Sequence, residues 1–254
     1  MDDEVLARVD AFLDATVRDS TDRVDVGPMR VLLSRRPWPY YARPRAELDL
    51  SAADAVTLEH VTAAAALLEQ NGAPVAFEWV RERVPSMDAA VTAYGFAVEA
   101  APLLVRPAEP LHPAAPDGVS LRLLTADDER VPDSARVVAA AFGSPYVEEH
   151  DHIRSRIERG LNVTAVAQAG DGSVVGVATL QPIDDAAEIV GVAVLPEHRR
   201  RGIGAALIRL LVAEASSRGV VTVLLSASPD GLALYESLGF VVVGTLATAP
   251  PDPY

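Results

Sequence analysis

EIVGVAVLPEHRRRGIGAALIRLL, residues 188–211, is the stretch that decides the fold. Its apolar residues 189–195 end at Pro196, a pattern typical of a buried strand. After Gly204 no glycine or proline follows until Gly219, which predicts a helix of about four turns. A strand, a glycine-containing turn and a helix therefore follow one another.

The turn itself, RRRGIG, combines features that suit an anion. Its two glycines leave the backbone open because they carry no Cβ. The N–H groups of a helix start lack intrahelical acceptors, and the positive end of the helix dipole adds to them. Three arginines add charge that can pair with phosphate oxygens. The turn predicts a pyrophosphate site; the alternative is a solvated basic turn at a helix start. The predicted site consists of Arg199, Arg200, Arg201, Gly202, Ile203, Gly204 and Ala205.

Composition narrows the classes of function. The 254 residues carry a formal net charge of −14, which argues against a nucleic-acid partner and suits a cationic or amine-bearing one. The absence of cysteine excludes disulfides and thiolate chemistry by the protein. No apolar run approaches the ~20 residues of a membrane span, and the acidic N-terminus lacks the features of a secretory signal. We therefore expect a cytoplasmic protein without a membrane partner. The histidines show no metal-ligand spacing, so no metal is expected.

A proline-rich segment suggests two domains. Residues 106–118, RPAEPLHPAAPDG, contain four prolines and cannot form a regular helix or a central strand. The predicted division is an N-terminal domain at 1–106, a linker at 107–118 and a C-terminal domain at 119–254.

The N-terminal part also contains a candidate helix start. Ser51 is followed three residues later by Asp54, which is close to a capping box. The pattern predicts a helix from Ser51 to Gln70.

Two segments of the chain resemble each other. PDGLALYESLGFVVV at 229–243 aligns without gaps on PSMDAAVTAYGFAVE at 85–99. In each, a proline opens a short helix that ends at Gly-Phe and enters a strand. Chance similarity of two alanine-rich helices is one explanation, but the matching order favours an internal repeat. The first copy lacks RRRGIG and has Val91 where the second has Tyr235. Chemistry is therefore expected in the second half alone.

Taken together, EIVGVAVLPEHRRRGIGAAL and SPDGLALYESLGF resemble the GNAT superfamily of acetyl-CoA-dependent N-acetyltransferases, over about residues 119–247. The resemblance implies an α/β (α+β) fold, with a mixed, splayed sheet flanked by helices. Residues 27–105 look like a smaller, degenerate GNAT-like half of the same fold.

The resemblance also implies acetyl-CoA as co-substrate. Its pyrophosphate would bind the amides of 199–204, and its pantetheine arm would pair with the preceding strand at Val192, Ala193 and Val194. Gly191 independently suggests either a bulge in that strand or a close backbone approach, and a bulge would open a slot beside the strand.

Acetyl transfer from a thioester to an amine needs a base, an oxyanion site and an acid. Tyr235 matches the family's tyrosine general acid, and a phenol with a pKa near 10 can protonate a departing thiolate. The alternative to this catalytic role is that the ring of Tyr235 only packs under the strand at Phe240. Glu188 matches the place where several members carry a general base; its alternative is a solvent-exposed acid at a strand end. A backbone amide near Val192 would form the oxyanion site.

Other assignments stay open. Ser228 stands where the family often has asparagine, so it either binds pantetheine or water or is a plain N-cap. The expected acceptor is a small-molecule or peptide amine, attacked directly without an acyl-enzyme. The alternative is an inactive acetyl-CoA-binding sensor. The sequence leaves a homodimer open.

Overall fold

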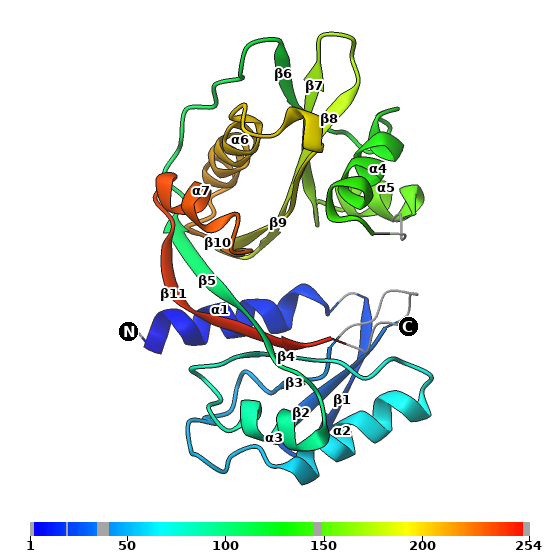
Figure 1. The fold of residues 1–254 in the computed structure, drawn as a ribbon, viewed down its shortest axis with the longest axis vertical. Coiled ribbons are helices and arrows are strands. Elements are labelled where there is room, and N and C mark those ends of the chain that lie inside the picture. Colours follow the sequence, from blue (N-terminus) through cyan, green and yellow to red (C-terminus); the bar gives the residue numbers. More distant parts are fainter. Residues whose placement is uncertain (1–2, 19, 35–40, 145–148, 251–254) are drawn as a thin grey trace. The chain divides into compact units, whose positions relative to one another are not determined.

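The computed structural model describes residues 3–18, 20–34, 41–144 and 149–250 (Figure 1). Eleven strands and seven α-helices lie in these ranges. Eight of the strands follow the order β4-β11-β5-β10-β9-β8-β7-β6, and three form a separate antiparallel sheet, β1-β2-β3. A mixed sheet with flanking helices confirms the predicted fold class. The three-stranded sheet was not predicted.

The chain divides into two compact units. Unit 1 comprises Met1–Leu104, Ser226–Leu232 and Val242–Tyr254, and unit 2 comprises Val105–Leu225 and Ala233–Val241. The C-terminal strand therefore belongs to unit 1, although the sequence places it after the elements of unit 2.

Unit 1 contains the N-terminal elements and most of the last strand. Strand β11 pairs antiparallel with β4, with Leu246 opposite Val80. The elements are α1 (Asp3–Thr16), β1 (Thr21–Val26), β2 (Met29–Ser34), β3 (Arg43–Pro44), α2 (Leu58–Gln70), β4 (Phe77–Val80), α3 (Met87–Tyr94), β5 (Glu99–Pro107), whose last three residues belong to unit 2, and β11 (Val241–Ala249), whose first residue also belongs to unit 2.

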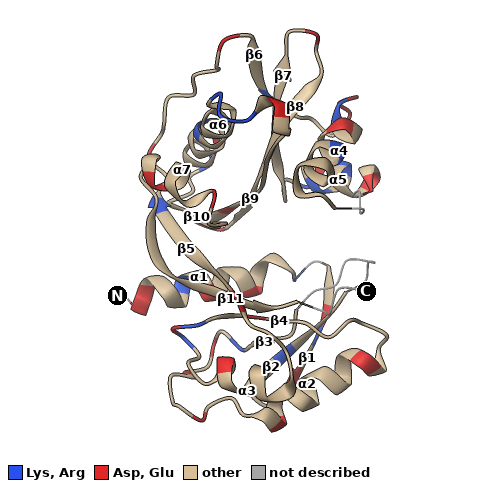
Figure 2. Cartoon of the chain, viewed as in Figure 1, with Lys and Arg blue, Asp and Glu red and all other residues tan. Residues whose placement is uncertain are grey.

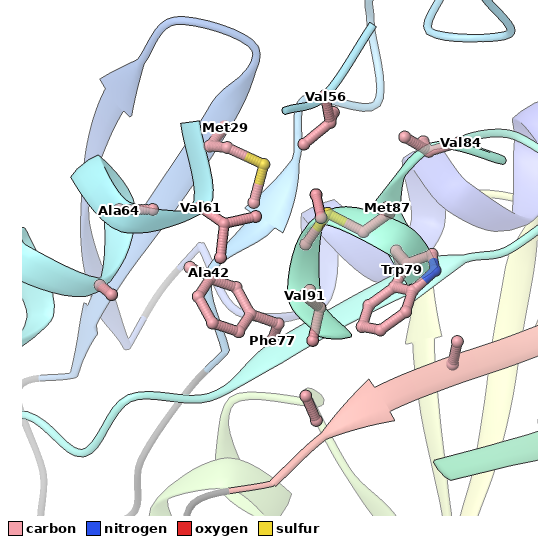
Figure 3. Close-up of a cluster of buried hydrophobic side chains, with 14 of the residues drawn as sticks. Met29, Ala42, Val56, Val61, Ala64, Phe77, Trp79, Val84, Met87 and Val91 are labelled. Atoms are coloured by element: carbon pink, nitrogen blue, oxygen red, sulfur yellow. The ribbon is translucent and has the colours of Figure 1, made fainter. Parts of the chain in front are cut away.

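The core of unit 1 lies between its helices and strands (Figure 3). Phe77 and Trp79 of β4 are fully buried against Met87 and Val91 of α3. The indole N–H of Trp79 donates to Asp88 at 2.9 Å, so the buried ring keeps a polar partner.

The predicted helix start at Ser51 is wrong. The N–H and hydroxyl of Ser51 both donate to one carboxylate oxygen of Asp49, at 3.1 and 2.7 Å, which holds the backbone in a turn. Such local side-chain bonds compete with helix formation. The helix begins at Leu58 instead, with Thr57 as its N-cap.

Unit 2 has helices on both faces of its strands. α4 packs on one face of β8 and β9, and α6 covers the other (Figure 1). The elements are β6 (Val119–Leu123), α4 (Val131–Phe142), α5 (His150–Glu158), β7 (Val163–Ala169), β8 (Val174–Ile183), β9 (Ala186–Val194), the 3-10 helix η1 (Pro196–His198), α6 (Ile203–Ser217), β10 (Thr222–Ser226) and α7 (Leu232–Ser237).

The two segments that resemble each other in sequence also end their helices alike. Gly95 after α3 and Gly239 after α7 have positive φ values of 113° and 83°. In both, the glycine N–H donates to the carbonyl three residues back, and the N–H of the following Phe96 or Phe240 donates to the carbonyl five residues back. The degenerate GNAT-like half itself stays a prediction.

A buried arginine links the helix and strands of unit 1. Arg43 is 2% exposed, and its guanidinium lies 2.8 Å from Asp10 and 3.4 Å from Glu78. Burial raises the pKa of both carboxyls, and Arg43 opposes that rise. Without the arginine, two buried carboxylates would lose this cation.

We predict that Arg43→Met lowers the free energy of unfolding by about 3–5 kcal/mol at neutral pH, because it breaks a buried ion-pair network. Arg45→Met is the matched control; its ion pairs are partly exposed, so a loss of about 1 kcal/mol or less is expected. Chemical denaturation of each variant measures the difference.

The pH dependence has a definite sign. A carboxyl whose pKa is raised by folding contributes stability at low pH and loses it as the pH rises through its folded pKa. The deficit of Arg43→Met should therefore shrink as the pH falls toward the ordinary values of 3.8 for Asp10 and 4.5 for Glu78. Equal losses in both variants at neutral pH contradict the prediction.

Candidate active site

Strand β9 has a bulge at the predicted glycine. Val190 pairs with Thr179 and Ala193 pairs with Val177, so two residues of β9 oppose one residue of β8. Gly191 has φ +61°, and a Cβ there would meet nothing within 4 Å. The backbone conformation, not crowding, is what requires glycine. The predicted bulge is confirmed.

The same strand parts from its other neighbour. β9 and β10 run parallel and pair from Ala186 with Thr222 to Glu188 with Leu224. β9 continues to Val194, beyond this register. Its backbone therefore has an edge not paired with β10 in the described register, next to the bulge. This is the splay that the resemblance implied.

Glu188 lies at the fork between the strands. It pairs with Gln181 of β8 on one side and with Leu224 of β10 on the other. Glu188 is half-buried. The general-base role of Glu188 stays a prediction.

After β9, the chain forms the predicted turn and helix start. Arg200 has φ +59° and Gly202, the N-cap of α6, has φ +79°. The N–H of Ala206 donates to the carbonyl of Gly202 at 3.0 Å and so starts the helix ladder. The N–H groups of residues 203–205 precede it and have no intrahelical acceptor. Free N–H groups with the positive end of the helix dipole behind them are suited to an anion.

The turn before α6 is basic (Figure 2), and its three arginines differ in their contacts. Arg199 donates from Nε to the carbonyl of Val194 at 3.0 Å and from Nη2 to the carbonyl of Ala141 at 3.1 Å. Arg201 lies 3.2 Å from Nδ1 of His198. Arg200 is exposed. Arg199 thus fastens the turn to β9 and to the end of α4, which sequence reasoning did not foresee.

Two glycines let α6 pack closely. A Cβ on Gly176 of β8 would lie 2.9 Å from Cγ2 of Ile203, the first residue of α6. A Cβ on Gly204 would lie 3.4 Å from Cδ2 of Leu234 on α7. The start of α6 is therefore held between β8 and α7. Gly176 was missed, although a glycine inside an apolar strand is a signal of close approach.

Tyr235 on α7 is buried, with 9% exposure. Its ring contacts Phe240 edge-to-face, with centroids 6.0 Å apart and planes at 73°. Burial raises the pKa of its phenol above the ordinary 10.0. The ring packing and a role as proton donor are compatible, because a raised pKa keeps the phenol protonated at neutral pH.

Ser228 precedes α7 in the segment that belongs to unit 1. Its carbonyl accepts hydrogen bonds from Gly231 at 3.0 Å and Leu232 at 3.2 Å, and its side chain is exposed. These bonds are typical of a helix start.

Two features are absent from the described ranges of the chain. No group of three or more histidine, aspartate or glutamate side chains there is arranged to hold a metal ion. No helix in those ranges is long and apolar enough to cross a membrane.

One known family matches part of unit 2. The family described as "Acetyltransferase (GNAT) family" matches residues 133–240, which contain the bulge, the turn and α7. Residues 133–240 are therefore similar to GNAT acetyltransferases. The matched range ends at Phe240, the residue against which Tyr235 packs.

Curated relatives match about a third of the chain. A "[Ribosomal protein bS18]-alanine N-acetyltransferase" from Salmonella typhimurium is 40% identical over 86 residues, which cover 33% of this chain and 56% of the relative. The Escherichia coli K12 protein of the same name is 38% identical over 73 residues, covering 28% and 49%. The chain spans about half the length of the curated relatives it matches.

Solved structures resemble more of the chain. A GCN5-related N-acetyltransferase from Kribbella flavida has a TM-score of 0.80 at 22% identity, covering 98% of this chain and 96% of that one. A tandem GNAT protein from the clavulanic acid biosynthesis pathway has a TM-score of 0.56 at 17% identity, covering 89% and 79%. At these low sequence identities, the similarity of the structures shows only that the fold is shared.

We predict that Gly191→Ala lowers the free energy of unfolding by about 1–2 kcal/mol, because a left-handed backbone costs this much for a residue with Cβ. Gly170→Ala is the control. A Cβ at Gly170 also meets nothing within 4 Å, but its φ lies outside the left-handed region, so no such strain arises. Thermal or chemical unfolding compares the two; equal stabilities would count against strain at the bulge.

Proposed function

We propose that unit 2 transfers an acetyl group from acetyl-CoA to a primary amine by direct attack, without an acyl-enzyme. The fork between β9 and β10 carries this proposal, because it leaves an open strand edge directly before an anion-binding turn. The pyrophosphate would bind the free amides of residues 203–205, and the pantetheine arm would lie along Val192–Val194. Arg200 and Arg201 would add charge, while Arg199 would hold the turn in shape.

The base and the acid of this proposal are Glu188 and Tyr235. Glu188, at the fork, would take a proton from the ammonium group of the acceptor, directly or through water, and so produce the nucleophilic amine. The amine nitrogen would then form a bond to the thioester carbon, and an amide in the bulge, such as that of Val192, would donate to the oxyanion. Collapse of the intermediate would break the C–S bond, and the phenol of Tyr235 would give its proton to the leaving thiolate. The nitrogen would lose its second proton to the resulting Tyr235 phenolate or to water. The products are an N-acetylated amine and CoA.

The acceptor is proposed only as an amine. The curated relatives are named for an alanine of a ribosomal protein, but they overlap this chain over about half of their length. The net charge of −14 favours a cationic acceptor. A panel containing a peptide with N-terminal alanine, a polyamine and free amino acids separates these classes.

Release of free CoA thiol across this panel tests the function itself. Amine-dependent release, with mass spectrometry of the acetylated product, is the expected result. Tight acetyl-CoA binding by calorimetry without release from any amine would overturn the enzymatic proposal and favour the sensor.

Tyr235→Phe should lower kcat by about 10- to 100-fold, because it removes the proton donor while keeping the ring that packs on Phe240. Tyr94→Phe, on α3, is the control and should leave kcat unchanged. Since burial raises the pKa of Tyr235 above 10.0, its titration should not reduce the wild-type rate below about pH 10. Unchanged turnover in Tyr235→Phe would remove this residue from the mechanism.

Glu188→Gln should lower kcat by about 100-fold or more, because an amide cannot accept the amine proton. Glu197→Gln, an exposed glutamate in η1, is the matched control. If the loss disappears when the acceptor is supplied mostly as free amine at high pH, the base role is supported. A loss that is independent of pH contradicts it.

A further inference from the structure

Arg106 is a buried arginine of unit 2 that the proposed chemistry does not use. It stands at the end of β5, ahead of residues 133–240 that match the family, and is 6% exposed. Its guanidinium donates to three backbone carbonyls, and its three acceptors are Leu238 at 2.8 Å, Pro107 at 2.9 Å and Glu109 at 3.2 Å. A buried charge held mainly by carbonyls is costly, so its position needs a reason.

Two contacts of Arg106 are with residues 238–240, the corner between α7 and β11. One is the carbonyl of Leu238, directly after the last residue of α7. Carbonyls at a helix C-terminus lack intrahelical donors and lie at the negative end of the helix dipole, so a cation suits this place. The other is the ring of Phe240, whose centroid lies 5.7 Å from Cζ of Arg106, within cation–π range.

The same ring of Phe240 lies against Tyr235. The edge-to-face contact of 6.0 Å links the phenol to the arginine through one intervening aromatic ring. The N–H of Phe240 also donates to the carbonyl of Tyr235 at 3.1 Å. Arg106 therefore fixes both the backbone that ends α7 and the ring that supports Tyr235.

We propose that Arg106 is a positioning residue for Tyr235, which it holds in the orientation needed to protonate the leaving thiolate. The proposal rests on the proposed role of Tyr235. Arginine suits the task because its planar group can donate in several directions and lie over a ring, whereas lysine offers a point charge.

A double-mutant cycle tests this. Arg106→Met should lower kcat by about 5- to 100-fold, since a displacement on the order of 1 Å costs up to about 100-fold, and should leave the KM for acetyl-CoA unchanged. In a Tyr235→Phe background, Arg106→Met should cost no more than about 2-fold further, because the group that it positions is gone. Multiplying losses would overturn the proposal, and so would a loss confined to KM.

Further variants separate positioning from simple destabilisation. Arg106→Lys keeps a cation and should give a kcat between those of the wild type and Arg106→Met. If Arg106→Met does not fold, a double-mutant cycle of Arg106→Lys with Tyr235→Phe takes its place. Arg122→Met removes a partly exposed arginine that pairs with Asp128 of the same unit. When it is assayed below its melting temperature, Arg122→Met should have the same kcat as the wild type.

The outcomes also separate this proposal from the function that it rests on. If Tyr235→Phe keeps full turnover, the acid role fails. If Tyr235→Phe loses turnover while Arg106→Met keeps it, only the positioning role fails.

Discussion

The fork at Glu188 is the constraint on which the rest of unit 2 depends. A strand inside a sheet normally uses the backbone groups on both of its edges, and unpaired buried groups are costly. Strand β9 leaves β10 after residue 188 and bulges away from the β8 register at residues 191–192. Its open edge can therefore be satisfied by water or by a ligand with amide groups of its own. The proposed binding of pantetheine along β9 depends on this fork.

The elements around the fork keep it in place. α6 must start close to the end of β9, and it does so because Gly176 and Gly204 allow tight contact with β8 and α7. Arg199 then fastens the turn by donating to the carbonyls of Val194 and Ala141. An arginine next to an anion-binding turn is easily assigned to the anion. The contacts of Arg199 show that one such side chain shapes the turn, while the backbone N–H groups stay available.

The sequence predicted the features that depend on local chemistry. The strand, turn and helix around residues 188–211 needed only apolar spacing, a proline and glycines, and the bulge needed only Gly191 in an apolar run. Local patterns failed where distant groups or side-chain bonds decided the outcome. The turn at Ser51 forms because Asp49 accepts its N–H and hydroxyl. The pairing of β11 with β4 joins residues far apart in the chain, and no local pattern encodes it. The three acceptors of Arg106 were equally invisible, since a proline-rich segment predicts a linker.

The two similar helix corners show how chemistry can be added to a shared backbone. Both end in a glycine with positive φ and the same pair of hydrogen bonds. After α3, the position equivalent to Tyr235 is Val91, which is fully buried in the core of unit 1. Phe96 in that corner stacks on Tyr94, with centroids 5.6 Å apart, whereas Phe240 lies under Arg106. The corner itself thus needs only the glycine and the aromatic ring. A phenol in place of valine and a cation over the ring are the additions that the second corner has, and they are the features that the proposed proton transfer requires.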